Sequence, residues 1–190
     1  MTLDITTIES PLGPITLVAR GEALVGLEFG DQAQRLAWLR DRLARRLGPT
    51  ELRATADPAG AASRLGAYFA GDLAALAEQP VELLGTSFQC AVWSALREIP
   101  AGRTESYGAL AARIGAPQAM RAVGAANGSN PIGIFVPCHR VLAADLTLHG
   151  YGGGLERKAW LLDHEGASWR AGREAREEPQ LPLFAAGGTR

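Results

Sequence analysis

The chain has 190 residues, of which 47% are hydrophobic, and its 19 basic and 20 acidic side chains give a formal net charge of −1. This length suits one or two domains with a sizeable core. The net charge by itself argues neither for nor against nucleic acid, but the charges along the sequence form no basic stripe. No run approaches the roughly 20 apolar residues of a membrane helix. The first residues carry no export signal, so we expect a cytoplasmic protein with no membrane association.

Residues 1–84 predict an α/β N-terminal domain with a small antiparallel sheet. Branched apolar residues over 2–30, interrupted by short Gly- and Pro-containing breaks, indicate a meander of strands. Leucines then recur every three or four positions over 32–47, which indicates an amphipathic helix. Residues 59–70 predict a second helix, and a linker over 75–84 closes this half of the chain.

Residues 85–170 predict a mostly helical domain. A helix capped by Thr86 or Ser87 precedes a short helix capped by Ser106, and Pro117 opens a third. Two short helices around a glycine-containing turn are typical of a helix-turn-helix, although two helices packed in a core give the same pattern. We expect a last helix from Leu155 to His164 and a disordered tail over 171–190.

The two cysteines, Cys90 and Cys138, lie far apart and form no disulfide framework, and no Cys/His cluster has zinc spacing, so no metal is implied. Cys138 precedes His139, and a thiol with an ordinary pKa of about 8.5 needs such a neighbouring base to react at neutral pH. Glu165 is a candidate to fix the imidazole tautomer. The alternative is a buried Cys138 beside a surface histidine. Cys90, in mid-helix, is interpreted as a buried structural thiol.

An ordered series of short motifs across residues 1–168 resembles the O(6)-alkylguanine-DNA alkyltransferase family in its stand-alone form. The series includes Ser10-Pro11-Leu12-Gly13, Tyr68-Phe69-Ala70-Gly71, Val92-Trp93, Ser106-Tyr107, Arg121-Ala122-Val123-Gly124, Asn130-Pro131, Pro137-Cys138-His139-Arg140-Val141, Gly150-Tyr151, Lys158, Trp160-Leu161-Leu162 and His164-Glu165-Gly166. The resemblance implies an α/β domain followed by a mostly α, winged-helix-like domain that contains a helix-turn-helix.

This resemblance also implies a reaction. One alkyl group would move irreversibly from O(6) of guanine in double-stranded DNA to Cys138, without a cofactor and in a monomer; O(4) of thymine is a second candidate site of attack. His139 would act as the base through a water, and Glu165 would orient it. Tyr107 would donate a proton to N3 of the departing guanine.

The resemblance assigns DNA contacts to the second helix of the pair. Arg121 would fill the gap that an extruded nucleotide leaves in the base stack. The small residues Ala119, Ala122 and Gly124 would let this helix enter the minor groove, which explains binding without a large basic patch.

Further residues are implied to form the pocket for the base. The carbonyls of Cys138 and Val141 would accept from the exocyclic amine of guanine. Tyr151 would line the pocket, and the backbone of Gly152 would approach the O(6) side of the base. Two more residues would support the pocket: Asn130 would brace the turn before the active-site strand, and Lys158 would contact the site from behind. One departure from the family pattern is Leu146, where a turn glycine is usual.

The tail contains a separate motif. Gln180, Leu181, Leu183 and Phe184 resemble the short peptides by which bacterial repair proteins dock on the polymerase sliding clamp. The alternative is a Pro-rich tail with chance apolar residues.

Three other functions compete with the alkyltransferase interpretation. A lesion-recognition protein would bind alkylated DNA without chemistry, but such proteins lack the reactive cysteine. A Cys-His hydrolase would need an oxyanion hole, for which we find no motif. A helix-turn-helix regulator would need more surface basicity.

Overall fold

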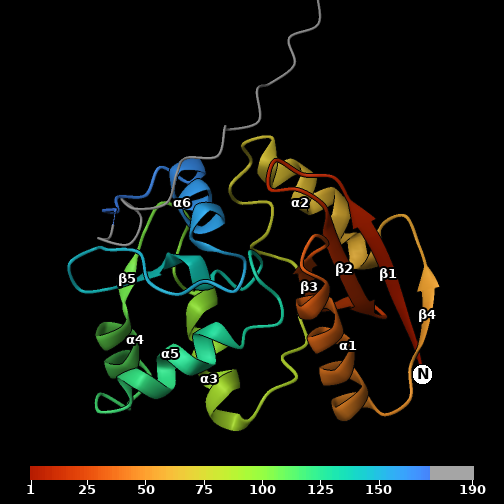
Figure 1. The fold of residues 1–190 in the computed structure, drawn as a ribbon, viewed down its shortest axis with the longest axis horizontal. Coiled ribbons are helices and arrows are strands. Elements are labelled where there is room, and N and C mark those ends of the chain that lie inside the picture. The colour runs from red at the N-terminus through yellow and green to blue at the C-terminus, as the bar shows by residue number, and fades with distance from the viewer. Residues whose placement is uncertain (172–190) are drawn as a thin grey trace, which may run out of the picture.

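A computed structural model describes residues 1–171 of the chain. The N-terminal half forms a four-stranded sheet with the strand order β3-β2-β1-β4 (Figure 1). The strands are β1 (Thr2–Ile8), β2 (Ile15–Arg20), β3 (Ala23–Phe29) and β4 (Glu51–Ala54). The antiparallel meander of β1, β2 and β3 is confirmed. The expectation of a purely antiparallel sheet was wrong, because β4 pairs parallel to β1 and the sheet is therefore mixed. Strand β4 escaped prediction because its residues are all exposed and show no apolar alternation.

Two helices cover the opposite faces of this sheet. The predicted helices are confirmed as α1 (Ala33–Leu47) and α2 (Ala61–Phe69), the latter preceded by the 3-10 helix η1 (Pro58–Gly60). Because alternate strand residues point to opposite faces, each helix meets its own apolar set. The apolar cluster between the sheet and α1 comprises Leu3, Val18 and Val25 of the strands and Leu39 and Leu43 of the helix. The set under α2 includes Ile15, Leu17, Leu24, Leu65 and Tyr68 and continues into the helical half of the chain.

The second half of the described chain is mostly helical, as expected. Its helices are α3 (Ser87–Arg97), α4 (Tyr107–Arg113), α5 (Met120–Gly128) and α6 (Leu155–His164). Figure 1 shows α3, α4 and α5 gathered at one end of this half and α6 at the other. The bounds predicted for α6 are confirmed. The pairing of α4 and α5 as a helix-turn-helix stays a prediction, as does the winged-helix likeness.

Local hydrogen bonds explain where two of these helices begin. Thr86 caps α3 in a capping box, since its side chain accepts from the backbone N–H of Gln89 and the Gln89 side chain accepts from that of Thr86. The predicted start of α5 at Pro117 was wrong. Ala119 has φ −95° and ψ 22°, and its N–H donates to the carbonyl of Ala116 at 2.8 Å, so a turn precedes the helix.

Two very short strands connect α4 to the cysteine motif. Strand β5 (Glu105–Ser106) pairs parallel with β6 (Val141–Leu142), and the 3-10 helix η2 (Cys138–Arg140) directly precedes β6. This ladder places Tyr107, the first residue of α4, beside the motif. The strand expected before Cys138 is absent from the described structure: residues 130–137 consist of turns and bends with a single bridge residue, Ile132, and Ile134 has φ +69°.

The sheet and the helical half meet along β3. The N–H of Leu27 donates to the carbonyl of Pro131 at 2.8 Å, and Leu27 forms a parallel bridge with Ile132. The turn that leads to Cys138 is therefore fixed to the edge of the N-terminal sheet. No helix among residues 1–171 is long and apolar enough to cross a membrane. The expected disordered tail and its motif at Gln180, Leu181, Leu183 and Phe184 fall outside the described residues, apart from position 171.

Candidate active site

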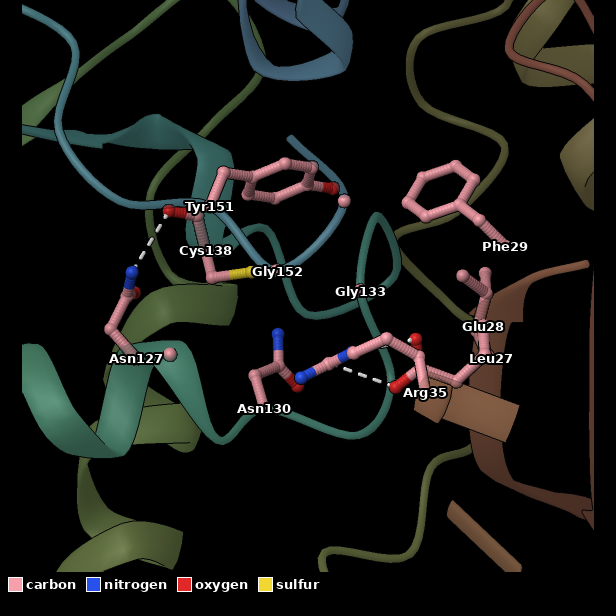
Figure 2. Close-up of a pocket in the computed structure, with 12 residues that line it drawn as sticks. Leu27, Glu28, Phe29, Arg35, Asn127, Asn130, Gly133, Cys138, Tyr151 and Gly152 are labelled. Atoms are coloured by element: carbon pink, nitrogen blue, oxygen red, sulfur yellow. Dashed lines mark hydrogen bonds and ion pairs between the residues drawn. The ribbon is translucent and has the colours of Figure 1, made fainter. Parts of the chain in front are cut away.

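Cys138 lies at the start of η2, and its side chain is almost fully buried, at 6% exposure. Its sulfur points into a small cavity of about 20 Å³, enough for roughly one water molecule (Figure 2). Both halves of the chain line this cavity, with β3 and α1 on one side and the turns around Asn130 and Gly152 on the other.

Cys90 is half-buried rather than buried, and its thiol donates to the carbonyl of Leu83.

His139 is fully buried, so the alternative of a surface histidine was wrong. Its Nε2 lies 3.0 Å from Oε1 of Glu165, the C-cap residue of α6. Its Nδ1 has no hydrogen-bond partner among the described residues. Burial lowers the pKa of His139 despite the neighbouring carboxylate, so the imidazole is neutral and able to accept a proton. Glu165 holds the ring in one orientation, as the sequence predicts.

The Glu165 carboxylate is the centre of a buried network. It accepts from Arg140 through Nε at 2.9 Å and a terminal nitrogen at 2.7 Å, and from the Tyr68 hydroxyl at 2.8 Å. Burial alone would raise the pKa of Glu165, but the hydrogen bonds from His139 and Arg140 and the charge of Arg140 outweigh burial and hold this pKa well below its usual range. Sequence reasoning gave Arg140 and Tyr68 no role, although both stand in quoted motifs.

Lys158 is fully buried and contacts the site from behind, as expected. Its Nζ donates to the carbonyls of Val141 and His149, both at 2.8 Å. Burial lowers the pKa of Lys158 to about 8. Burial likewise raises the pKa of the Cys138 thiol, and the hydrogen bond from Asn130 and the charge of Lys158 act in the opposite direction.

Two asparagines shape the backbone around Cys138. Asn130 accepts from the N–H of Ile132 at 3.0 Å and donates to the carbonyl of Val136 at 2.7 Å, which braces the turn as predicted. Asn127 was missed. Its side chain donates to the carbonyl of Cys138 at 3.3 Å (Figure 2), but an asparagine near a helix end also occurs commonly as a cap and gave no distinctive signal.

The loop that carries Tyr151 and Gly152 lines the same cavity. The Tyr151 ring packs edge-on to Phe29 of β3, with 6.5 Å between ring centroids. A Cβ added at Gly153 would lie 2.4 Å from the Phe29 ring, so only glycine fits here without rearrangement. Leu146 adopts φ +68°, which places this residue in a conformation that usually requires glycine.

A second, larger cavity of about 460 Å³ lies between the α4–α5 pair and the turn after β6. Tyr107, Arg121 and Gly124 line this cavity, together with Ser106, Gly108, Met120, Ala143, Ala144 and His149. Burial raises the pKa of the Tyr107 phenol, and the nearby Cys138 adds to the effect. Arg121 is exposed, so the structure gathers it with Tyr107 at a hollow large enough for a small ligand.

The other two residues predicted to contact DNA lie on or next to α5. Ala122 is exposed in its first turn, whereas Ala119 is half-buried at its N-cap, outside the lining of this cavity.

Two family models match nearly all of the described chain. Residues 4–83 match the 6-O-methylguanine DNA methyltransferase, ribonuclease-like domain, and residues 87–167 match the 6-O-methylguanine DNA methyltransferase, DNA binding domain. The chain belongs to the 6-O-methylguanine DNA methyltransferase family.

Individual relatives and a solved structure point to the same family. The chain is 46% identical over 160 residues to the methylated-DNA–protein-cysteine methyltransferase of Shigella flexneri, with 84% of this chain and 93% of the relative covered. It is 47% identical over 162 residues to the protein of that name from Mycobacterium tuberculosis H37Rv, with 84% and 90% covered. Its fold matches M. tuberculosis OGT in complex with DNA at a TM-score of 0.70 and 44% identity, covering 87% of this chain and 93% of that one.

Proposed function

We propose that this protein is a DNA-repair alkyltransferase, a methylated-DNA–protein-cysteine S-methyltransferase that acts once. It moves a methyl or other alkyl group from O(6) of guanine in DNA onto the sulfur of Cys138. The observation that carries this proposal is a nearly buried thiol followed directly in the chain by a fully buried imidazole, whose Nε2 is held by Glu165 and whose Nδ1 has no hydrogen-bond partner among the described residues. The names of relatives that are 46–47% identical support the same activity.

The proposed reaction assigns a step to each polar group. Cys138 gives its proton to Nδ1 of His139 through one water, and the resulting imidazolium is stabilised by Glu165. The sulfur then attacks the alkyl carbon, so that an S–C bond forms and the C–O(6) bond breaks. The electron pair of that bond stays with guanine, and Tyr107 donates a proton to N3. The product is a thioether, which nothing in the site converts back to a thiolate.

The guanine base has backbone acceptors available. Each carbonyl oxygen can accept two hydrogen bonds. Lys158 occupies one acceptor position of the Val141 carbonyl, and Asn127 occupies one of the Cys138 carbonyl. The second position of the Val141 carbonyl is assigned to the exocyclic amine of guanine. The Cys138 carbonyl also accepts from the backbone N–H of Val141, so its contact with the amine requires one of these two hydrogen bonds to give way. We assign this contact to both carbonyls and the O(6) side of the base to the Gly152 backbone.

DNA binding is assigned to the α4–α5 pair, acting as a helix-turn-helix that approaches the minor groove. Arg121 would enter the base stack, and the small residues Ala122 and Gly124 would allow close approach. Because the chain has a net charge of only −1 and no basic stripe, we expect few phosphate contacts and a shallow dependence of affinity on salt.

A product assay tests the proposed activity. Limiting protein is mixed with duplex DNA that contains one O(6)-methylguanine, and the nucleosides are quantified after digestion. We expect guanine to appear at one equivalent per protein molecule and then stop. Multiple turnover would contradict the proposal in favour of a hydrolase, and tight binding without product would favour a lesion-recognition protein.

The clamp contact of residues 180–184 is a finer part of the same proposal. A peptide of these residues should bind the purified sliding clamp, whereas a variant with alanine at Leu183 and Phe184 should not. Equal binding of both peptides, or no binding of the first at high micromolar concentration, would remove the contact from the account.

A further inference from the structure

A buried ion pair from the N-terminal domain lies at the edge of the Cys138 cavity. Glu28, on β3, is only 3% exposed, and Arg35, on α1, donates to its two carboxylate oxygens at 3.1 and 2.8 Å. Both residues line the cavity into which the Cys138 sulfur points. Figure 2 shows Arg35 extending from the N-terminal side toward Asn130 and the thiol. Neither residue has a part in the reaction steps above.

Burying such a pair is expensive, because both charges lose hydration and their attraction often fails to compensate. Burial raises the pKa of Glu28 to about 7, against the charge and the hydrogen bonds of Arg35. The ion pair therefore contributes little to the stability of the fold. Its position at the cavity is more readily explained by a role of Arg35 in the active site.

The Arg35 guanidinium also lies against the loop that faces the substrate. A Cβ added at Gly152 would be 2.9 Å from a terminal nitrogen of Arg35, so this side chain packs directly on the Gly152 backbone. Next to it, the Gln32 amide, oriented to satisfy both of its groups, donates to the Gly152 carbonyl at 3.1 Å and accepts from Arg157 at 3.1 Å. The start of α1 therefore supports the backbone that is assigned to the O(6) side of guanine.

The same guanidinium acts on the thiol electrostatically. Burial raises the pKa of Cys138, and the positive charge of Arg35 is one of the influences that lower it. Lys158 supplies another cation. Titratable groups that face or adjoin the thiol are His139, Tyr107, Tyr151, Lys158, Arg35 and Glu28.

We propose that Arg35, held by Glu28, is a positioning residue of the active site, through which the N-terminal domain supports the Gly152 backbone and places a positive charge beside the Cys138 sulfur. The support of the substrate loop rests on the proposed function. The charge beside the sulfur does not, because it concerns the thiol alone.

The first test therefore measures the thiol without DNA. Iodoacetamide labelling of the tryptic peptide that contains Cys138 is followed as a function of pH in the wild type and in Arg35→Gln. Loss of the guanidinium should move the midpoint upward by about 0.5–1 pH unit, so that labelling at pH 7 slows by about three- to tenfold. Arg40→Gln removes the same charge from an exposed position of α1 and should leave the midpoint unchanged. Equal midpoints for these two variants would overturn the role of the charge.

Two further variants separate the charge from the contact with the loop. Arg35→Lys keeps the charge but loses the paired hydrogen bonds to Glu28, so its midpoint should match the wild type while repair of duplex DNA slows by about threefold or more. Glu28→Gln should not raise the midpoint, since Arg35 stays charged. Wild-type repair by Arg35→Lys would overturn the role in loop support. Suppose that Arg35→Gln shifts the labelling midpoint but the wild-type protein shows no methyl transfer. That combination would uphold the charge effect and overturn only the proposed function.

Discussion

The two sides of Cys138 are built in different ways. On the relay side, His139, Arg140 and Glu165 form a buried network in which one carboxylate accepts several hydrogen bonds. On the loop side, the Gly152–Gly153 backbone is supported by Phe29 and Arg35 from the other half of the chain. The relay side depends on satisfied charges, and the loop side depends on close packing and one ion pair. Substitutions on the two sides should therefore fail in different ways.

The largest effect is expected on the relay side. Glu165→Gln keeps the shape but removes the charge that pairs with Arg140, so the free energy of unfolding should fall by about 3–5 kcal/mol. The rate of methyl transfer should fall by about 100-fold or more, because His139 loses the group that orients it. Urea unfolding and single-turnover kinetics measure the two effects, with Glu156→Gln, exposed on α6, as the control. A wild-type rate in Glu165→Gln would show that the relay is not needed.

A smaller effect is expected away from both sides, on α5. Arg121→Ala should slow repair in duplex DNA by about 10- to 100-fold, since the unstacking of a base costs a few kcal/mol. Reaction with free O(6)-methylguanine should change by less than about twofold, because no base has to leave a stack. The exposed Arg103→Ala is the matched control. Equal slowing with both substrates would mean that Arg121 has no part in base extrusion.

On the loop side, the expected effect is steric. Gly153→Ala places a methyl group 2.4 Å from the Phe29 ring, and the rearrangement should lower stability by about 1–3 kcal/mol. Gly66→Ala, within α2, meets no atom within 4 Å and should stabilise the protein by about 0.5–1 kcal/mol. Thermal unfolding of the two variants makes the comparison. If both shift stability in the same direction, the close packing of the loop on β3 is not a constraint.

The last expected effect concerns the pH dependence of stability and accumulates gradually over several pH units. Because the pKa of folded Glu28 is about 7 and its ordinary value is 4.5, between these values the folded state holds a proton that the unfolded state has released. The free energy of unfolding should therefore decline as pH rises from about 4.5 to about 7, by at most about 1.4 kcal/mol per pH unit from this group. Glu28→Gln should remove that decline, whereas the exposed Glu22→Gln should keep it. Urea unfolding of the wild type and the two variants across this pH range measures the effect. Parallel curves of unfolding free energy against pH for all three proteins would contradict the raised pKa of Glu28.

The sequence predicted the relay side better than the loop side, for a physical reason. Cys138, His139 and Glu165 stand in contiguous motifs, so their chemistry could be interpreted before their positions were known. Glu28 stands in the short family motif Leu27-Glu28-Phe29, which indicates no chemistry, and Arg35 stands in no motif. Both reach the site only because Leu27 on β3 bonds to the turn before Cys138. Interactions between residues about 100 positions apart leave no local pattern.

The same distinction applies to the fold. Long periodic segments such as α1 and α6 were predicted well, because their apolar faces repeat over several turns. Strands β5 and β6 have two residues each and no periodicity, so nothing local marked them. The start of α5 was misplaced because a proline is compatible both with the first turn of a helix and with a preceding turn.

The most direct test of the central claim is the mass of the intact protein after reaction with duplex DNA that contains one O(6)-methylguanine. The account predicts a gain of one CH2 unit per molecule, located on the peptide that contains Cys138 and absent from Cys138→Ser. A wild-type protein that gains no mass, or a Cys138→Ser variant that gains the same mass, would contradict it.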